Sequence, residues 1–367
     1  MKKNITAQHS PRGGKRISQP ITIGMDLGDK TSRYCELEGD AMRESSLATT
    51  KKAMLQKFGS MRRCRIAIEV GAHSRWVNRL LSELGHEVYV ANARQVKLIS
   101  QSSRKDDRLD AKTLARLARV DHQLLGPIRH RSEEAQQDLN VIRVRARLLD
   151  MRTSAVNAVR GMAKASGERL PKCDADQMGV ERSEHLPAQL RETLKPLLEV
   201  VEALTEKIQQ CDEKIEQIAR DKYPETKLLK QVSGVGTLIA LTFVLTLEDK
   251  QRFQKSRDVG CYVGLRPKRS GSGARQPQLG ISKEGDMYLR KLLVQGAHGI
   301  LRHRGPDTDL KRWGLKLGER GGKNAKKRAI VAVARKLGIL LHRLWVTAEV
   351  YEPLRHSLAR QRLRPAA

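Results

Sequence analysis

The sequence has few of the residues on which several common classes of protein depend. Aromatic residues make up 3% of the 367 residues, which argues against a platform that stacks many unpaired bases. The five cysteines are scattered and never spaced as Cys-x-x-Cys, so a disulfide framework or structural zinc site is not expected. No apolar run is long enough to cross a membrane, and the basic N-terminus lacks the apolar segment of a secretory signal. These absences predict a cytoplasmic protein with no membrane partner.

Acidic residues are scarce relative to basic ones. The chain has 71 Lys and Arg residues against 41 Asp and Glu, a formal charge of +30. A surplus of this size predicts nucleic-acid binding through neutralisation of phosphates. Hydrophobic residues make up 39%, which is enough for a folded core and unlike a disordered basic tail. Because aromatic residues are few, contacts with the nucleic-acid backbone and grooves are favoured over base stacking.

Four acidic residues form a pattern within this basic chain. Asp26 and Glu69 end apolar, strand-like segments, and Asp107 and Asp110 open a helix. Taken singly, each has an ordinary explanation as a turn, surface or helix-capping residue. Beside a polyanion, however, a carboxylate repels phosphate unless a divalent cation lies between them. Together the four predict a Mg²⁺ site for phosphodiester chemistry.

The N-terminal part of the chain has the pattern of an α/β domain that follows a flexible basic arm at residues 1–20. Short apolar or alternating segments predict strands over residues 21–27, 33–37, 42–47, 65–70 and 87–90. Helical periodicity predicts helices over residues 74–84 and 107–120. The domain is expected to span residues 21–130.

Residues 131–225 are expected to form two long helices with a connection between them. Apolar residues recur at alternating spacings of three and four through residues 139–156 and 197–218, a pattern that predicts a coiled-coil seam. The segment 167–187 between them is rich in Pro, Gly, Asp and Lys and reads as a connection. The helices can fold back as a hairpin or pair with another subunit, and the sequence does not choose. The length of the seam favours a homo-oligomer.

A mainly α-helical domain is expected over residues 226–350, with a basic tail at 351–367. Its Val232-Ser-Gly-Val-Gly236 turn before an apolar helix has the pattern of a helix-hairpin-helix, in which backbone amides meet phosphate. A helix with a basic start is expected over residues 323–336. Phosphate contact is the natural use of its charges, and a solvated helix face is the alternative.

A Gly-rich, basic loop at residues 264–273 precedes the motif Ile281-Ser-Lys. A serine in such a loop usually forms a turn, but its basic neighbours can hold a scissile phosphate and stabilise the charge of its transition state. Ser282 is expected to cap the helix that follows. The candidate nucleic-acid-binding residues of the domain are Arg266, Lys268, Arg269, Arg275, Lys283, Arg290, Lys323, Lys326, Lys327 and Arg328.

Taken together, these motifs resemble the transposases of the insertion sequence 110 family, relatives of the Piv DNA invertase. Asp26, Glu69 and Asp107-Arg-Leu-Asp110 match the DEDD signature of that family. The resemblance continues, in the family's order, through Val232-Ser-Gly-Val-Gly, Gly264-Leu-Arg-Pro, Ser272-Gly and residues 281–286 and 327–336. It covers nearly the whole chain after the basic arm.

The resemblance implies an RNase H-like (RuvC-like) N-terminal domain, in which the four acids bind Mg²⁺, and a C-terminal transposase domain with a catalytic serine. In the family this serine lies nine residues before the Ile-Ser-Lys motif and is followed by a glycine, which gives Ser272. Ser270 is the other candidate, because this chain reads Ser-Gly-Ser-Gly where members often have Ser-Ser-Gly. Some members are guided by a structured bridge RNA and act as tetramers, in which the acids of one subunit meet the serine of another.

The resulting hypothesis is an insertion-sequence transposase, a site-specific DNA recombinase of the bacterial cytoplasm or nucleoid. Its expected partners are double-stranded donor and target DNA, a structured guide RNA, and copies of itself in a dimer or tetramer. One alternative is a RuvC-like metal-dependent nuclease that forms no covalent intermediate and leaves the Ser272 loop unexplained. A non-enzymatic basic scaffold is a second alternative, and it gives the four acids no role.

Overall fold

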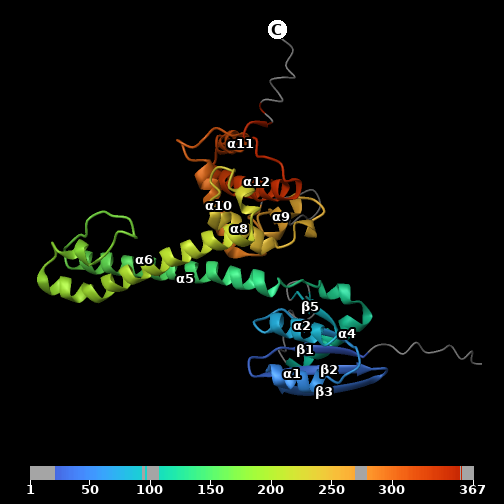
Figure 1. The fold of residues 1–367 in the computed structure, drawn as a ribbon. Helices are drawn as coiled ribbons and strands as arrows, with labels where there is room; N and C mark the ends of the chain where they lie inside the picture. Colours follow the sequence, from blue (N-terminus) through green and yellow to red (C-terminus); the bar gives the residue numbers. More distant parts are fainter. Residues whose placement is uncertain (1–20, 93–95, 97–106, 269–278, 356, 358–367) are drawn as a thin grey trace, which may run out of the picture. The chain divides into compact units, whose positions relative to one another are not determined.

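The computed structural model describes residues 21–92, 96, 107–268, 279–355 and 357. The chain divides into two compact units, residues 1–130 and 131–367 (Figure 1). The basic arm, most of the basic tail and four candidate site residues lie outside the described residues. These four are Arg269, Ser270, Ser272 and Arg275.

The N-terminal unit is built on one mixed five-stranded sheet with the order β3-β2-β1-β4-β5. Its strands are β1 (Thr22–Asp26), β2 (Thr31–Glu38), β3 (Ala41–Ala48), β4 (Arg65–Glu69) and β5 (Glu87–Ala91). The first three strands form an antiparallel meander, whereas β4 pairs in parallel with β1 and β5 pairs in parallel with β4. Each of the five strands overlaps a segment that the sequence predicted as a strand, although β3 is almost entirely exposed.

Helices cover both faces of this sheet. One face packs against α1 (Lys51–Phe58) and α2 (Ser74–Glu83) through buried Ile, Met, Phe, Val and Leu side chains. The other face is covered by α4 (Asp107–Val120), which packs Leu114 and Ala118 against Ala67 of β4. A 3₁₀ turn, η1 (His122–Leu125), follows α4. This arrangement confirms the α/β character of the N-terminal part.

The helix α1 was not predicted, because its sequence gives only a weak amphipathic signal. Met54 and Phe58 are its two buried residues and lie four apart on one face. Thr50 caps its N-terminus by accepting a hydrogen bond from the amide of Ala53 at 3.2 Å. Once docked, Phe58 packs edge to face against Tyr34 of β2, which shows that tertiary packing stabilises a helix of low intrinsic signal.

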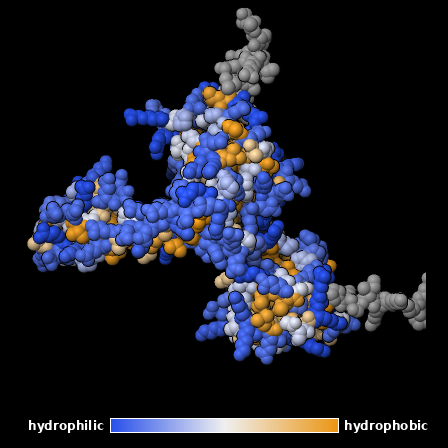
Figure 2. Space-filling model, in the orientation of Figure 1, coloured by the Kyte–Doolittle hydropathy of each residue, from blue (hydrophilic) through white to orange (hydrophobic). Residues whose placement is uncertain are grey.

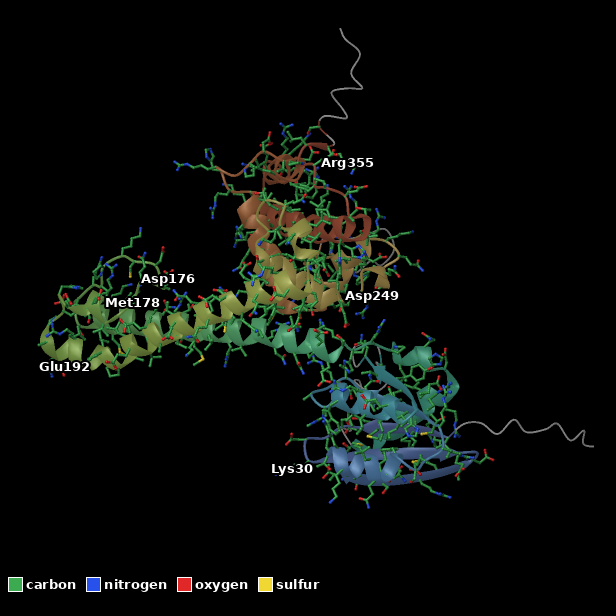
Figure 3. The ribbon with its side chains drawn as sticks, in the orientation of Figure 1. Lys30, Asp176, Met178, Glu192, Asp249 and Arg355 are labelled. Carbon is green, nitrogen blue, oxygen red and sulfur yellow. The ribbon has the colours of Figure 1, made fainter. Side chains whose placement is uncertain are left out.

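In the C-terminal unit, α5 (Glu133–Ala165) and α6 (Ala188–Lys222) fold back on each other as an antiparallel hairpin (Figure 1). Arg145 donates a hydrogen bond of 3.0 Å to Asp212, and Arg152 donates one of 3.2 Å to Thr205. The connection between the helices contributes Met178, labelled in Figure 3, which is buried against both of them. Of the two arrangements left open by the sequence, the chain by itself adopts the hairpin.

The rest of this unit is a cluster of helices around one hydrophobic core. Their bounds are α7 (Thr226–Leu229), α8 (Thr237–Leu247), η3 (Lys250–Arg252), α9 (Arg257–Tyr262), α10 (Met287–Ile300), α11 (Asp309–Gly318) and α12 (Ala325–Thr347), and η2 (Val180–Ser183) lies in the hairpin connection. The apolar helix α8 joins this core to the hairpin, because Leu241 and Leu245 pack with Ile215 and Ile218 of α6. The C-terminal part is therefore helical, as predicted. Within the described ranges, no helix is both long and apolar enough to cross a membrane.

Candidate functional site

Asp26 and Glu69 lie at the same edge of the sheet. The parallel register of β1 and β4 pairs Met25 with Ile68, so the next residue on each strand is one of the two acids. Side chains two residues apart project from the same face of a strand. Asp26 therefore shares the face of Gly24, and Glu69 shares the face of Ala67, which is the face that α4 covers. Both acids are half-buried.

The start of α4 is placed beside this edge by the absence of a side chain at Gly24. A β-carbon on Gly24 would lie 2.1 Å from the carbonyl oxygen of Ala111 and 2.3 Å from the amide nitrogen of Ala115. The backbone of α4 thus rests directly on β1, two residues before Asp26. Asp110, half-buried, immediately precedes Ala111 on this helix. Three of the four acids predicted from the sequence therefore come from the parts of β1, β4 and α4 that adjoin one edge.

The loops that follow β1 and β4 also meet at this edge. Nε2 of His73 lies 3.6 Å from the carboxylate of Asp29, and Nε1 of Trp76 donates a hydrogen bond of 3.1 Å to Nδ1 of the same histidine. Because Nδ1 accepts that bond, Nε2 carries the proton that faces Asp29. The contact connects the two loops beside the acidic residues.

Carboxylate oxygens are the donors that Mg²⁺ prefers, so the chemistry of this edge suits such an ion. No three His, Cys, Asp or Glu side chains are grouped closely enough to hold a metal among the residues that the structure describes. That set leaves out the side chain of Asp107, the fourth acid, although its backbone forms the first turn of α4. The fit of these residues to Mg²⁺ therefore rests on their carboxylate oxygens and on the position of Asp26, Glu69 and Asp110 at one edge of the sheet.

The Gly-rich loop of the C-terminal unit emerges from a short antiparallel stem. The amide of Lys268 donates to the carbonyl of Gly280 at 2.8 Å, and the amide of Ser282 donates to the carbonyl of Arg266 at 2.9 Å. Pro267 and Ile281 form the bridge between these bonds. The hydrogen-bonded residues Lys268 and Gly280 flank residues 269–278, which include Ser270 and Ser272 and lie outside the described residues.

Two glycines allow this stem to pack against the chain around it. Gly264 has a φ of +71°, and a β-carbon on it would lie 2.1 Å from the carbonyl oxygen of Glu284. Gly285 has a φ of +73°, and its β-carbon would lie 1.9 Å from the carbonyl oxygen of Tyr262. Any other residue at either position would meet both an unfavourable backbone conformation and a clash with backbone.

Asp286 joins the stem to α10 and to the hairpin. Its carboxylate accepts a hydrogen bond of 2.8 Å from the amide of Leu289, which caps α10, and it also pairs with the guanidinium of Arg143 on α5. Arg143 lies over the ring of Tyr288, 5.1 Å from its centroid. Burial raises the pKa of Tyr288, against the opposite effect of Arg145.

The capping role predicted for Ser282 was therefore wrong. Ser282 and Asp286 both have a short polar side chain of the kind that caps a helix. The helix α10 begins at Met287, however, and Asp286 immediately precedes it. Ser282 lies in the stem instead, where its hydroxyl is 3.5 Å from the amide of Glu284. The helix starts after Ser282 because Gly285, which lies between Ser282 and Asp286, has a φ of +73° and so cannot belong to a right-handed helix.

Comparison with known proteins identifies the family. Residues 226–311 match the family model described as Transposase IS116/IS110/IS902 family, and residues 23–165 match an IS110 DEDD model described as Transposase. Together these matches cover more than half of the chain. The chain belongs to the IS110 family of transposases.

Several individual transposases are similar in sequence to this chain along most of their length. The transposase for insertion sequence element IS1111A from Coxiella burnetii is 28% identical over 300 residues, which are 78% of this chain and 79% of that protein. A probable family 20 transposase from Pseudomonas aeruginosa is 28% identical over 83% of this chain and 90% of its own length. The transposase for element IS1328 from Yersinia enterocolitica is 28% identical over 75% of this chain and 82% of its own length. This chain is accordingly a DNA transposase, an enzyme that acts on DNA.

The basic residues predicted to bind nucleic acid lie on two parts of the transposase. Arg266, Lys268 and Lys283 are exposed at the stem. Lys323, Lys326, Lys327 and Arg328 are exposed around the start of α12, which begins at Ala325 and not at residue 323. Arg290 differs from these, because its Nη1 donates to the carbonyls of Val263 and Glu284 at 3.0 and 2.7 Å. That guanidinium therefore also stabilises the stem of the transposase.

Sequence reasoning missed three residues that position this site in the transposase. Gly24 was overlooked, although a glycine inside a strand often signals the close approach of another backbone. Asp286 was available as an acidic residue immediately before an apolar helix, which is a capping signal. Arg143 gave no such signal, because its partner Asp286 lies far along the chain and only the folded hairpin brings the two together.

Proposed function

We propose that this transposase cuts and rejoins DNA through a phosphoserine intermediate at Ser272, with Mg²⁺ held by Asp26, Glu69, Asp107 and Asp110. The observation that carries the proposal is the shared edge of β1 and β4, where two acids end neighbouring parallel strands and α4 begins close by. The strand order, with an antiparallel meander followed by two parallel strands, also supports an RNase H-like fold for this domain.

The four carboxylates would together form one binding site for the metal ion. When bound, Mg²⁺ polarises the phosphodiester and stabilises the departing oxygen. The protein residues supply the ligand oxygens and fix their positions, since Asp26 and Glu69 are held by the register of the sheet and Asp110 by the close packing of α4 on Gly24. Without such an ion, carboxylates this close to DNA would repel the phosphates.

Ser272 would be the nucleophile of the strand-transfer step. Its Oγ forms a bond to phosphorus as the bond from phosphorus to a deoxyribose oxygen breaks, and the serine proton ends on the departing oxygen. The ester conserves the energy of the broken bond, so a deoxyribose hydroxyl of another strand can reverse the reaction and release the serine. Arg266, Lys268 and Lys283, exposed at the stem, would neutralise phosphates near this loop.

The remaining partners follow from the same proposal. Lys326, Lys327 and Arg328 would bind phosphates along donor and target DNA. The turn before α8, with Gly234 at a φ of +82°, would act as the helix-hairpin-helix. We extend the proposal to a structured guide RNA and to a homo-oligomer of two or four copies, for which the excess of positive charge and the long hairpin are the supporting features.

The proposal is tested with the full-length protein, Mg²⁺ and labelled DNA that carries the junction of the element, with RNA transcribed from its flanks. Denaturing gels should show a protein–DNA adduct in the wild type and none in Ser272→Ala, whereas Ser270→Ala should retain it. Asp26→Asn should lower strand exchange by about 100-fold or more, which is the scale of losing a main electrostatic contribution, and should leave DNA binding intact. Cleaved DNA without any adduct, in both wild type and Ser272→Ala, would favour a metal-dependent nuclease.

A further inference from the structure

A pocket of about 790 Å³ opens between α10, α11 and α12 of the C-terminal unit. Its floor is apolar and is formed by Leu301, Ala329 and Ile330. Figure 2 shows hydrophobic side chains, in orange, at the surface in the region of α11 and α12, among hydrophilic ones. Leu315, also in the lining, keeps 46% of its surface exposed. Apolar area therefore remains for a ligand to cover.

Three glycines contribute to the lining of the pocket. Gly299 of α10 and Gly314 and Gly318 of α11 all belong to its lining. Gly314 is required by close packing, because a β-carbon there would lie 2.5 Å from Val333 and 2.7 Å from Leu301. A β-carbon on Gly318 would meet no atom within 4 Å, so its absence is not explained by packing. Of the three glycines, Gly318 is the one whose missing side chain leaves space that a ligand can enter.

The rim of the pocket carries mostly positive and hydrogen-bonding groups. His298, Arg302 and Lys326 lie there with one acid, Glu319, and all four are exposed. Gln295 adds an amide that can both donate and accept hydrogen bonds. The surrounding segment also carries a net positive charge, since residues 302–343 contain 13 Lys and Arg residues against 3 Asp and Glu residues. The ligand that complements this rim is an anion with an apolar, planar part.

We propose that this pocket receives an unpaired base of bound DNA. The base would lie on Leu301, Ala329 and Ile330 beside Gly318, and the flanking phosphates would contact Arg302 and Lys326. Gln295 would face the hydrogen-bonding edge of the base. An apolar protein segment fits the floor but does not use the positive rim, so charge complementarity favours DNA. The inference rests on the action of the transposase on DNA and is independent of the chemistry at Ser272.

The test uses full-length protein without Mg²⁺ and fluorescence anisotropy of two labelled probes. One probe is a short single-stranded oligothymidylate, and the other is an oligonucleotide of the same length whose interior nucleotides are abasic. We expect the wild type to bind the probe with bases about tenfold more tightly, because a base would remove apolar lining from water, and burial of about 55 Å² at about 25 cal/mol per Å² corresponds to this factor. Gly318→Phe should reduce the ratio to about twofold or less without changing the affinity for the abasic probe, because its ring would fill the open space at Gly318 and cover the apolar lining that a base would otherwise bury.

Matched variants separate a blocked pocket from a disturbed fold. Gly318→Ala should keep the wild-type ratio, because the added carbon meets open space. Leu315→Asp, at an exposed position of the lining, should lower the ratio as Gly318→Phe does. Ser272→Ala should keep it, which separates this inference from the proposed strand transfer.

Cross-linking locates the base directly. An oligonucleotide that contains 4-thiothymidine, irradiated on the wild type, should be linked to peptides from residues 295–330, and Gly318→Phe should lose that link. An unchanged ratio in both Gly318→Phe and Leu315→Asp, or cross-links confined to other peptides, would overturn the inference. If the pocket instead binds a protein segment, the ratio should stay unchanged in both variants and the cross-links should lie elsewhere. An oligouridylate that binds with the ratio expected for DNA, while the oligothymidylate does not, would also contradict the assignment to DNA.

Discussion

Gly24 and Ala111 are in direct contact through their backbones, with the carbonyl oxygen of Ala111 lying 2.1 Å from the place of a β-carbon on Gly24. One is the third residue of β1 and the other is the fifth residue of α4. The contact therefore sets the height of α4 above the sheet, and with it the position of Asp110 relative to Asp26. A glycine in a strand thus affects the acidic edge without carrying any functional group.

Replacing Gly24 by Ala should lift α4 from β1. We expect a loss of about 3 kcal/mol or more in stability, at the upper end for overpacking, because the added carbon meets backbone that cannot change rotamer. Hydrogen–deuterium exchange should show reduced protection over residues 107–120, together with reduced strand exchange. Gly71→Ala is the control, since a β-carbon on Gly71 meets no atom within 4 Å. Equal protection of α4 in wild type and Gly24→Ala would disprove this role of the contact.

The sequence predicted the central strands β1 and β4 well because they are short apolar segments that are buried on both faces of the sheet. Ile23 and Met25 pack toward α1 and α2, whereas Gly24 lies against the backbone of α4, so a register shift by one residue would bring a bulky side chain against α4. The same reasoning placed Asp26 and Glu69 at strand ends. That they end adjacent, parallel strands depends on the order of strands in the sheet, which no local pattern encodes.

Features that depend on distant partners were not predicted. The seam along α6 is apolar whether its partner is α5 or another copy of the chain, so periodicity alone could not select the hairpin. The helix α1 is stabilised by the burial of Met54 and Phe58 against the sheet, and its remaining residues show no helical periodicity of apolar side chains. The choice between Ser282 and Asp286 as cap depended on the backbone at Gly285, which the sequence indicates only as a glycine.

Asp286 should contribute more to stability than Ser282. Asp286→Ala removes the cap of α10 and the partner of Arg143, and we expect a loss of about 2 kcal/mol in the free energy of unfolding. Asp286→Asn keeps an oxygen that can accept from Leu289 but loses the charge, so its loss should be about half as large. Ser282→Ala should change stability by less than about 0.5 kcal/mol. Urea unfolding followed by circular dichroism measures all three, and a larger effect for Ser282→Ala would contradict the capping assignment.

His342 should make stability depend on pH. The imidazole is buried, with Nδ1 3.0 Å from the hydroxyl of Ser256 and Nε2 3.0 Å from the carbonyl of Lys250, and burial lowers its pKa. In the unfolded chain the same group binds a proton near about pH 6.5. Because the unfolded state then binds more protons, the stability present above this pH is lost as the pH falls through it.

The urea midpoint of the wild type should therefore fall more than that of His342→Gln between about pH 7.5 and about pH 5.5. The variant will be less stable at every pH, because it loses contacts to Phe253 and Ser256, so the informative quantity is the difference in slope. Parallel curves for the two proteins, or a steeper fall in the variant, would show that His342 is not held neutral in the folded state.

Gly264→Ala should impair the chemistry of the Ser272 loop more than it impairs DNA binding. The substitution combines a φ of +71° with a β-carbon 2.1 Å from the carbonyl oxygen of Glu284, so the stem between residues 264 and 283 must open. We expect adduct formation to fall by about 100-fold, since displacement of a reacting group by about 1 Å costs this much. Gly280→Ala is the matched control, because it lies in the same stem and its β-carbon meets no atom within 4 Å. Adduct yield on a denaturing gel and DNA affinity by anisotropy give the two readouts, and equal losses in both for Gly264→Ala would mean that the glycine stabilises the whole unit and not the loop.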